Sequence, residues 1–534
     1  MKTYHKIAAF VGSALMLGSC ADYLVREPQD ALDPATFFSS QENAVIAVNG
    51  IYNAALEPVK GRTYAIDFDC MSDNMYNYSQ EFGQGTHGSS SVYALNFWSR
   101  GYRGISRANT LLAWLDHCYE ITVPTTNIKD RLRSEALFLR AYFYSELIDF
   151  FGDVPMYLEQ VDLADSKPRT PKAQIVEQIL GDLEEAARHL PVTYAAEDTG
   201  RATCGAALAL KGKIELYNGM YAQAAETLKE VIDLKDENGA LRYDLYPLYR
   251  ELFLPQNEDN CEVIFDIQYM KNAYSQGLSH QLYTFTYEWN SYCPTSALAE
   301  SYYTKNGYPV SWNAETQLYE SADPAFDPTY PYKDRDPRLD QSIIMPGTDN
   351  GRGAIFLPSS SNHTGMKIRK WNDYTETEKN NSEHNIILIR FADVLLMRAE
   401  ALVESGTFDE AEVRGLIDRV RQRPSVMMPK VEDIEGTELD ANALRAIIRH
   451  ERRVEFAFEG TRVSDIRRWR IGPEVMTDAY GYKYQDVRLN PPKYIPYKVD
   501  TRSFNPNRDY LWPIPQNEIN TNPFINAPDQ NPGY

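Results

Sequence analysis

The chain has 534 residues, of which 43% are hydrophobic and 24% are charged. This mixture is typical of globular proteins and excludes a largely disordered chain, a collagen-like repeat and a small disulfide-stabilised scaffold. Acidic residues outnumber basic residues by 75 to 54, which gives a formal net charge of −21 at pH 7. Because such a chain repels polyanions on average, we expect no nucleic-acid partner.

The segment 1–19 has the features of a secretory signal. Two lysines precede a mostly apolar run from Ile7 to Leu17, and this run is too short to span a bilayer. The next residues, Leu17-Gly-Ser-Cys20, resemble the bacterial lipoprotein signal. The resemblance implies cleavage before Cys20 and acylation of the new N-terminus, which would hold the mature chain on membrane lipid. The alternative is an ordinary signal followed by a chance cysteine.

Apolar residues recur every three or four positions in many segments, and this spacing predicts a mainly α-helical fold. The clearest stripe consists of Leu132, Ala136, Leu139, Phe143 and Leu147. The predicted helices span residues 40–58, 97–120, 129–151, 171–190, 203–218, 221–235, 386–405, 408–423 and 441–459.

Two of the predicted helix pairs share one spacing of small and aromatic residues. Small residues allow the two helices of a hairpin to approach closely, and the aromatic residue fills the space beside the turn. The pattern resembles the tetratricopeptide helical hairpin, although any two tight helical hairpins could share it. The two copies are Gly212…Gly219-x-Tyr221-x-x-Ala224 and Ala399…Gly406-x-Phe408-x-x-Ala411.

Long segments between the helices are rich in Tyr, Trp, Asn, Gly, Ser and Pro. Their many large aromatic residues argue against disorder, and long ordered loops on a scaffold often carry function. We therefore expect one domain over 20–534 with three parts. These are a helical scaffold (about 30–60, 97–250 and 386–470), a loop-rich ligand region (about 60–97 and 255–385) and a C-terminal capping segment (472–534).

Five short blocks stand at intervals along the mature chain. They are Cys20-Ala-Asp-Tyr-Leu24, Glu135-Ala-Leu-Phe-Leu-Arg140, Arg390-Phe-Ala-Asp393, Glu451-Arg-Arg-Val-Glu455 and Trp512-Pro-Ile-Pro515. Together, and in this order, they resemble the SusD/RagB family of outer-membrane lipoproteins. The resemblance covers essentially the whole mature chain. It implies a tetratricopeptide-like helical scaffold that carries a loop-rich, aromatic-rich ligand-binding region.

The same resemblance implies a function. The family member is a non-catalytic, lipid-anchored protein of the cell surface that captures oligosaccharide and delivers it to a SusC-like TonB-dependent transporter in the outer membrane. The family often has an acidic stretch after the lipid cysteine, whereas here only Asp22 precedes Arg26. Two alternatives stay open, namely a peptide- or glycoprotein-binding uptake lipoprotein on the same scaffold and a secreted glycoside hydrolase.

Three glutamates spaced four residues apart raise the question of catalysis. Paired carboxylates perform glycoside hydrolysis, but neighbouring arginines lower carboxylate pKa values, whereas an acid catalyst needs a raised one. We therefore predict an ion-pair network and no catalytic residue. The glutamates are Glu451, Glu455 and Glu459, and the neighbouring arginines are Arg449, Arg452, Arg453 and Arg462.

No metal or other cofactor is expected. The eight histidines show no zinc-binding spacing, and the loop Asp334-Arg-Asp336-Pro-Arg338 lacks the spacing of a calcium loop. The cysteines after Cys20 form no C-x-x-C pair, and a disulfide among Cys70, Cys261 and Cys293 has no support from the pattern.

Aromatic residues in the loops are the candidates for glycan contact. A sugar ring presents an apolar C–H face, which Trp and Tyr cover, and a girdle of hydroxyls, which polar side chains bind. Any one of these rings could instead pack in the core. Two loop segments, 73–78 and 287–292, supply this mixture, and Trp312 is a third candidate. The candidate glycan-binding residues are Asp73, Asn74, Tyr76, Trp289, Tyr292 and Trp312.

Overall fold

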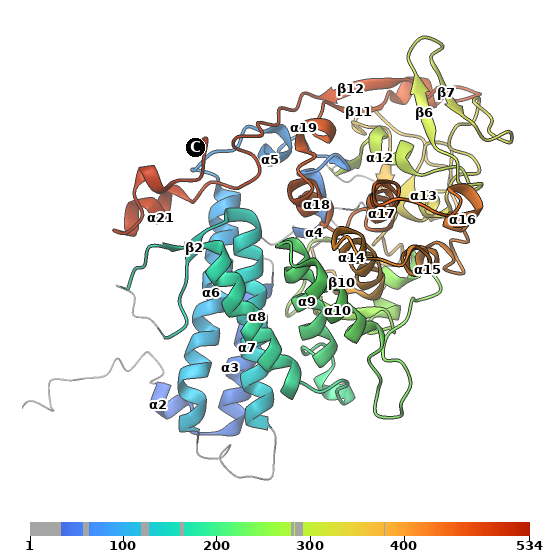
Figure 1. Cartoon of the computed structure of the whole chain (residues 1–534). Helices are drawn as coiled ribbons and strands as arrows, with labels where there is room; N and C mark the ends of the chain where they lie inside the picture. The colour runs from blue at the N-terminus through green and yellow to red at the C-terminus, as the bar shows by residue number, and fades with distance from the viewer. Residues whose placement is uncertain are drawn as a thin grey trace, which may run out of the picture.

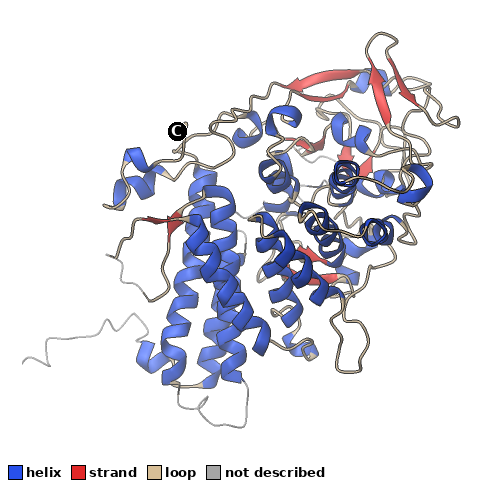
Figure 2. Cartoon of the chain, in the orientation of Figure 1, coloured by secondary structure: helices blue, strands red, loops and turns tan. Residues whose placement is uncertain are grey.

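The computed structural model describes residues 34–56, 64–118, 128–160, 165–278, 282, 292–378 and 380–534. The signal segment 1–19, the predicted lipidation residue Cys20 and the candidate contact Trp289 lie outside the described residues. The fold is mainly helical, which confirms the predicted class, and the sheets of the described residues have two strands each (Figure 2).

The long helices lie within residues 41–232 and 391–455, whereas short elements dominate between these two ranges and after them (Figure 1). The α-helices are α2 (Pro34–Phe37), α3 (Gln41–Ala55), α4 (Tyr64–Cys70), α5 (Glu81–Gln84), α6 (Val92–Trp114), α7 (Ile128–Phe151), α8 (Lys172–His189), α9 (Cys204–Tyr217), α10 (Tyr221–Ile232), α12 (Ser296–Ser301), α13 (Pro337–Ser342), α14 (Phe391–Glu404), α15 (Glu410–Arg421), α16 (Val431–Ile434), α17 (Ala441–Glu455), α18 (Arg462–Arg468), α19 (Gly472–Val475), α20 (Tyr484–Val487) and α21 (Gln516–Thr521). The 3-10 helices are η1 (Leu115–His117), η3 (Ala196–Asp198), η4 (Glu251–Phe253), η5 (Pro255–Asn257) and η6 (Ala527–Asp529). The paired strands are β1 (Met75–Tyr76) with β5 (Cys293–Pro294), β2 (Val154–Pro155) with β3 (Arg169–Thr170), β4 (Val263–Ile267) with β10 (Ile386–Arg390), β6 (Val310–Asn313) with β7 (Leu318–Ser321), β8 (Ile343–Ile344) with β9 (Lys367–Ile368), and β11 (Ala479–Tyr482) with β12 (Pro496–Asp500).

Helices α3, α6, α7 and α8 run side by side as a bundle (Figure 1). The whole predicted stripe of α7 is buried in it, because an apolar stripe gains free energy when a neighbouring helix covers it. Glycines on α6 let α7 approach closely. A Cβ on Gly104 would lie 2.1 Å from the Phe143 ring, and one on Gly101 would lie 2.9 Å from Leu147.

This packing predicts opposite results for two helical glycines. Gly104→Ala is expected to destabilise the protein by about 1–3 kcal/mol, because the new methyl group overpacks the contact with Phe143. Gly181→Ala on α8 is the matched control: its Cβ would meet nothing within 4 Å, so we expect stabilisation of about 0.4–1 kcal/mol. Urea unfolding of both variants measures this, and equal effects would contradict the packing.

The two predicted hairpins form as α9–α10 and α14–α15. Gly212 faces Leu228 across the first hairpin, where a Cβ would lie 2.7 Å from a Leu228 methyl carbon. Gly219 and Gly406 stand in the two turns with φ of 77° and 75°. This left-handed conformation favours glycine, which explains the repeated spacing in the sequence.

Several predicted helix boundaries are wrong. Residues 386–390 form β10, which pairs antiparallel with β4 (Ile386↔Ile267, Arg390↔Val263), because a short apolar run buried on both faces fits a strand as well as a helix. Helix α6 starts at Val92, earlier than predicted, since the Ser91 hydroxyl caps it by accepting from the Ala94 N–H (3.2 Å). Helix α17 ends at Glu455.

The C-terminal segment packs against the N-terminal bundle through Trp512. The Trp512 ring lies 4.3 Å from the Phe150 ring, 4.4 Å from Phe82 and 5.4 Å from Phe97, centroid to centroid. Its backbone N–H donates to the carbonyl of Phe150 (2.7 Å). The two ends of the described chain therefore share one hydrophobic core.

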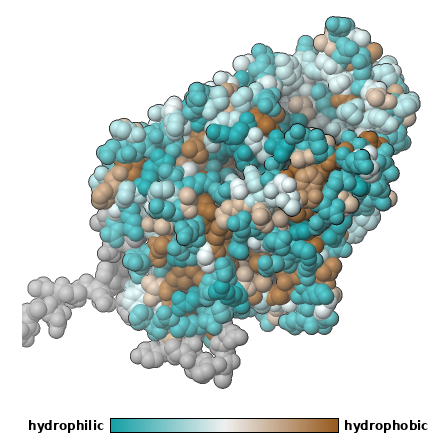
Figure 3. Space-filling model, viewed as in Figure 1, coloured by the Kyte–Doolittle hydropathy of each residue, from teal (hydrophilic) through white to brown (hydrophobic). Residues whose placement is uncertain are grey.

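The face shown in Figure 3 is mostly hydrophilic, with apolar residues in small patches. This agrees with the acidic composition of the chain. No helix in the described ranges has the length and apolar character that a membrane span requires. The five cysteines of the described ranges form no disulfide, and no group of His, Cys, Asp or Glu there has a metal-binding arrangement.

Candidate functional site

The predicted segment 73–78 follows α4 and contains strand β1. Asn74 begins it and is fully buried: its amide donates to the carboxylate of Asp69 (2.9 Å), and its side-chain oxygen accepts from the guanidinium of Arg453 (3.3 Å). Burial raises the pKa of Asp69 to about 7, although the hydrogen bonds from Asn74 and from the Gly460 N–H oppose this shift. Asn74 therefore ties the start of the strand to the helical scaffold.

Asp73 makes a second tie to the scaffold. Its carboxylate accepts from the Arg462 guanidinium at 2.8 and 3.0 Å and lies 2.8 Å from Arg453. Burial alone would raise the pKa of Asp73, but the charges of Arg453 and Arg462 outweigh burial and lower it to about 2. The side chains of Asp73 and Asn74 are thus both buried and bonded within the protein, in positions that hold strand β1 in place.

Strand β1 brings the two predicted aromatic loops together. It pairs antiparallel with β5, with Tyr76 opposite Cys293 and Met75 opposite Pro294. The half-buried Tyr292 directly precedes β5, so it reaches the same edge as Tyr76. Thr295, just after β5, locks this pairing, because its hydroxyl donates to the carbonyl of Asp73 (2.6 Å).

The rings of the buried Tyr76, of Tyr78 and of His363 meet beyond β1, and Tyr497 reaches them through the backbone of His363. We call these four residues the aromatic surface. The His363 ring lies 5.5 Å from the Tyr76 ring and 6.5 Å from the Tyr78 ring. The Tyr497 hydroxyl donates to the backbone carbonyl of His363. The Tyr78 side chain is 49% exposed and His363 is exposed as well, so the surface offers rings to solvent.

Two local backbone features fix the positions of Tyr78 and His363. After β1, the Asn77 side chain accepts from the Ser79 N–H (2.9 Å), and this turn leaves Tyr78 at its tip. Behind His363, Gly365 has φ of 76°, and a Cβ there would lie 2.6 Å from the carbonyl oxygen of Tyr482 on β11. A glycine is therefore required for the loop of His363 to lie against β11.

Trp312 stands on the neighbouring hairpin β6–β7, opposite Tyr319 in the register. The two rings are 5.1 Å apart, and Trp312 is half-buried. The Tyr319 hydroxyl lies 2.7 Å from the hydroxyl of Tyr482, whose N–H donates to the carbonyl of Thr364 (2.8 Å). A chain of bonded residues thus connects Trp312 to the loop that carries His363, although Trp312 makes no ring contact with the aromatic surface among the described residues.

Tyr78, His363 and Tyr497 are not among the glycan-binding residues predicted from the sequence. Tyr78 belongs to the predicted segment 73–78 and had a local signal. His363 sits in a Ser-Asn-His-Thr-Gly segment (361–365) without any local signal. Tyr497 lies in the aromatic-rich tail, and only the tertiary structure brings its hydroxyl to His363.

Residues 261–534 match the model of a protein family described as the SusD family. The chain belongs to the SusD family. Residues 22–216 match a second family model, described as starch-binding and associating with the outer membrane.

Relatives of this SusD-family protein align over most of its length. SusD-like protein P2 of Formosa agariphila is 27% identical, with 100% of both chains covered. The starch-binding protein SusD of Bacteroides thetaiotaomicron is 25% identical over 76% of this chain and 73% of its own. The crystal structure of a SusD-like carbohydrate binding protein from Bacteroides fragilis superposes with a TM-score of 0.79 at 29% identity, covering 92% of this chain and 100% of the other.

Membership confirms the resemblance seen in the sequence. SusD-family members are glycan-binding proteins that associate with the outer membrane, and they are not enzymes. The prediction that this chain is a glycan-binding protein without catalytic activity is therefore confirmed at the level of the family.

The predicted ion-pair network around Glu455 is present in this SusD-family protein. The Glu455 carboxylate contacts the guanidinium groups of Arg338 (2.9 Å), Arg390 (2.8 Å) and Arg423 (2.9 Å). Burial would raise its pKa, but these three charges hold the pKa well below its usual range. A carboxylate held ionised in this way is unsuited to general-acid catalysis.

The partners in this network differ from those expected from sequence proximity. Glu451 pairs with Arg338 and Arg421, and Glu459, beyond the end of α17, pairs with Lys370 and Arg390. The neighbouring arginines bind elsewhere: Arg452 contacts Asp393 and Asp465, Arg453 and Arg462 contact Asp73, and Arg449 lies over the Trp469 ring.

Proposed function

We propose that this protein captures oligosaccharide at the cell surface on its aromatic surface and delivers it to a SusC-like TonB-dependent transporter of the outer membrane. The observation that carries the binding site is the convergence of Tyr76, Tyr78, His363 and Tyr497, with Tyr78 exposed, at the edge where Tyr292 arrives. Family membership and the names of the aligned relatives support a carbohydrate ligand.

The chemistry of the aromatic surface suits a sugar. An exposed tyrosine face covers the C–H face of a pyranose, and its hydroxyl can exchange hydrogen bonds with the ring hydroxyls. Polar groups flank the rings. The Lys483 ammonium lies 5.7 Å from the centre of the Tyr497 ring, and the Gln84 amide donates to the Tyr78 carbonyl (3.4 Å). We propose that Tyr292 and Trp312 extend the site and that Trp289 is a further glycan contact, whereas Asp73 and Asn74 hold strand β1 in position.

A pair of tyrosine variants tests the site. Tyr78→Ala is expected to weaken oligosaccharide binding by about tenfold or more, because it removes an exposed stacking face. Tyr330→Ala is the matched control, since Tyr330 is also exposed (43%) and makes no ring contact with the aromatic surface. A glycan array identifies the ligand, and calorimetric titration then measures the affinity of each folded variant.

The outcomes separate the alternatives. Trp289→Ala and Trp312→Ala in the same titration show how far the site extends. If Tyr78→Ala, Trp289→Ala and Trp312→Ala all keep the wild-type affinity for a confirmed glycan, the proposed binding site is wrong. Binding of peptides but of no glycan on the arrays would favour the peptide-uptake alternative, and release of reducing ends by the purified protein would favour a hydrolase.

Anchoring is the second part of the proposal. Acylation at Cys20 would tether the mature chain to outer-membrane lipid, as the Leu17-Gly-Ser-Cys20 sequence suggests. We expect Cys20→Ala to release the protein from the outer-membrane fraction in a strain without the transporter. That strain is required because the transporter alone could retain the protein, and membrane attachment that persists in it would contradict lipidation at Cys20.

A further inference from the structure

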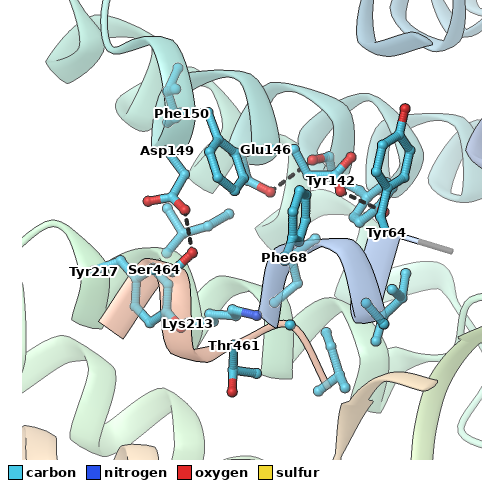
Figure 4. Close-up of a pocket in the computed structure, with 18 of the residues that line it drawn as sticks. Tyr64, Phe68, Tyr142, Glu146, Asp149, Phe150, Lys213, Tyr217, Thr461 and Ser464 are labelled. Carbon is cyan, nitrogen blue, oxygen red and sulfur yellow. Dashed lines mark hydrogen bonds between the residues drawn. The ribbon is translucent and has the colours of Figure 1, made fainter. Parts of the chain in front are cut away.

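A pocket separate from the aromatic surface lies between the helical bundle and the centre of the molecule. It has a volume of about 150 Å³. One wall comes from α4, α6 and α7, and the other comes from α9, β4, β10 and α18 (Figure 4). Residues of the aromatic surface do not line it.

The inner part of this pocket is apolar and buried. Its floor consists of aromatic and aliphatic side chains from both walls, and each of them is buried. These residues are Tyr64, Ile148, Leu210, Ile214, Phe265 and Ile389. Such a floor receives a hydrocarbon group, and an apolar cavity of about this size in another protein holds benzene.

The carboxylates that line the pocket are all bonded within the protein. Glu146 accepts from the Tyr142 hydroxyl (2.9 Å) and forms an ion pair with the buried Arg100. Asp149 accepts from the Ser464 hydroxyl (2.6 Å), as Figure 4 shows. Glu459, the third, pairs with Lys370 and Arg390. A cationic ligand would have to compete with each of these partners.

Two lysine ammonium groups at the half-exposed side of the pocket differ from these carboxylates in their contacts. Lys172 at the start of α8 and Lys213 on α9 both line the pocket. Neither forms an ion pair within 4.0 Å with any residue in the described ranges. Asp149 and Asp153 act on Lys172 only as more distant charges. The Lys213 ammonium lies 5.5 Å from the centre of the Tyr217 ring and acts on Glu146 as a more distant charge. Burial lowers the pKa of Lys172, although the charges of Asp149 and Asp153 oppose this shift.

We propose that this pocket binds a small organic carboxylate, with its hydrocarbon group on the buried floor and its carboxylate at Lys213 and Lys172. Ammonium groups without an ion-pair partner among the described residues favour an anionic acceptor, and the apolar floor favours a hydrocarbon body. The volume limits that ligand to roughly six to ten non-hydrogen atoms. This site is independent of the proposed oligosaccharide site, because the two share no residue.

Benzoate is the probe, with benzyl alcohol and benzylamine as matched compounds of the same ring size. Ligand-observed NMR and calorimetry on the wild-type protein are expected to detect binding of benzoate and to show it at least about tenfold stronger than binding of the other two. Equal binding of all three compounds, or no binding of benzoate, would overturn the proposal.

Substitutions of lining residues test whether benzoate binds in this pocket. Lys213→Gln is expected to weaken benzoate binding by about tenfold, the loss typical of removing one charge-assisted hydrogen bond. Lys211→Gln is the control, because Lys211 lies on the same helix outside the pocket and pairs with Glu215. Ser145→Phe introduces a ring from a half-exposed lining position and is expected to abolish binding.

Each variant is first shown to be folded by circular dichroism, and its oligosaccharide affinity is measured in parallel. Folded Lys213→Gln and Ser145→Phe proteins that keep full benzoate affinity would overturn the proposal, whatever happens at the aromatic surface. Loss of benzoate binding with unchanged oligosaccharide binding would support it.

Discussion

Glu455→Gln is expected to lower the free energy of unfolding by about 3–5 kcal/mol. The substitution removes one negative charge from among Arg338, Arg390 and Arg423, all of which are buried. Those guanidinium groups cannot regain water without opening the core, so the protein keeps poorly compensated charges inside. Chemical unfolding at pH 7 measures the loss.

Glu184→Gln is the control for this prediction. Glu184 forms an exposed ion pair with Arg188 on α8, and such pairs contribute about 0–1 kcal/mol. Glycan affinity of folded Glu455→Gln protein is expected to stay close to the wild-type value. A loss of stability as small as that of the control would show that the network contributes little. Glycan turnover by the wild type that Glu455→Gln abolishes would show that Glu455 is catalytic.

Buried ion pairs at Glu455 and at Asp73 make stability depend on pH in the acidic range. The pKa of Glu455 is lowered in the folded state, and that of Asp73 falls from 3.8 to about 2. As the pH falls through their ordinary pKa values, the unfolded chain binds these protons first. The stability that the two carboxylates contribute is therefore fully present above about pH 5 and is lost as the pH falls toward 2 and below. The Glu455→Gln protein is expected to lose less stability over this interval than the wild type.

Trp512→Ala should destabilise the protein to a similar degree, by about 3–5 kcal/mol. The indole is buried among Phe82, Phe97 and Phe150, and alanine would leave a cavity at the point where the C-terminal segment meets the bundle. Thermal unfolding monitored by near-UV circular dichroism measures this effect.

Phe524→Ala in the same C-terminal segment is the control for Trp512→Ala. Phe524 is 55% exposed, so its removal is expected to change stability by no more than about 0.5 kcal/mol. If both variants unfold at the wild-type temperature, the contact of Trp512 with the bundle does not stabilise the fold.

The sequence by itself determined the features that depend on neighbouring residues. The stripe from Leu132 to Leu147 follows the helical period, and the turn glycines Gly219 and Gly406 follow from a local need for positive φ. The family blocks are likewise strings of adjacent residues, and the comparisons confirm the family that they indicated. The charge pattern around Glu455 predicted a network because opposite charges cannot be buried apart.

Only the tertiary structure decided what depends on distant residues. Residues 386–390 form a strand because Val263–Ile267 supplies a partner, and a short apolar run carries no sign of that partner. Glu455 binds Arg338, Arg390 and Arg423 rather than its sequence neighbours, since burial leaves room only for the guanidinium groups that the fold delivers there. His363 and Tyr497 join Tyr78 for the same reason: ring contacts and hydrogen bonds act over a few ångströms in space, whatever the separation along the chain.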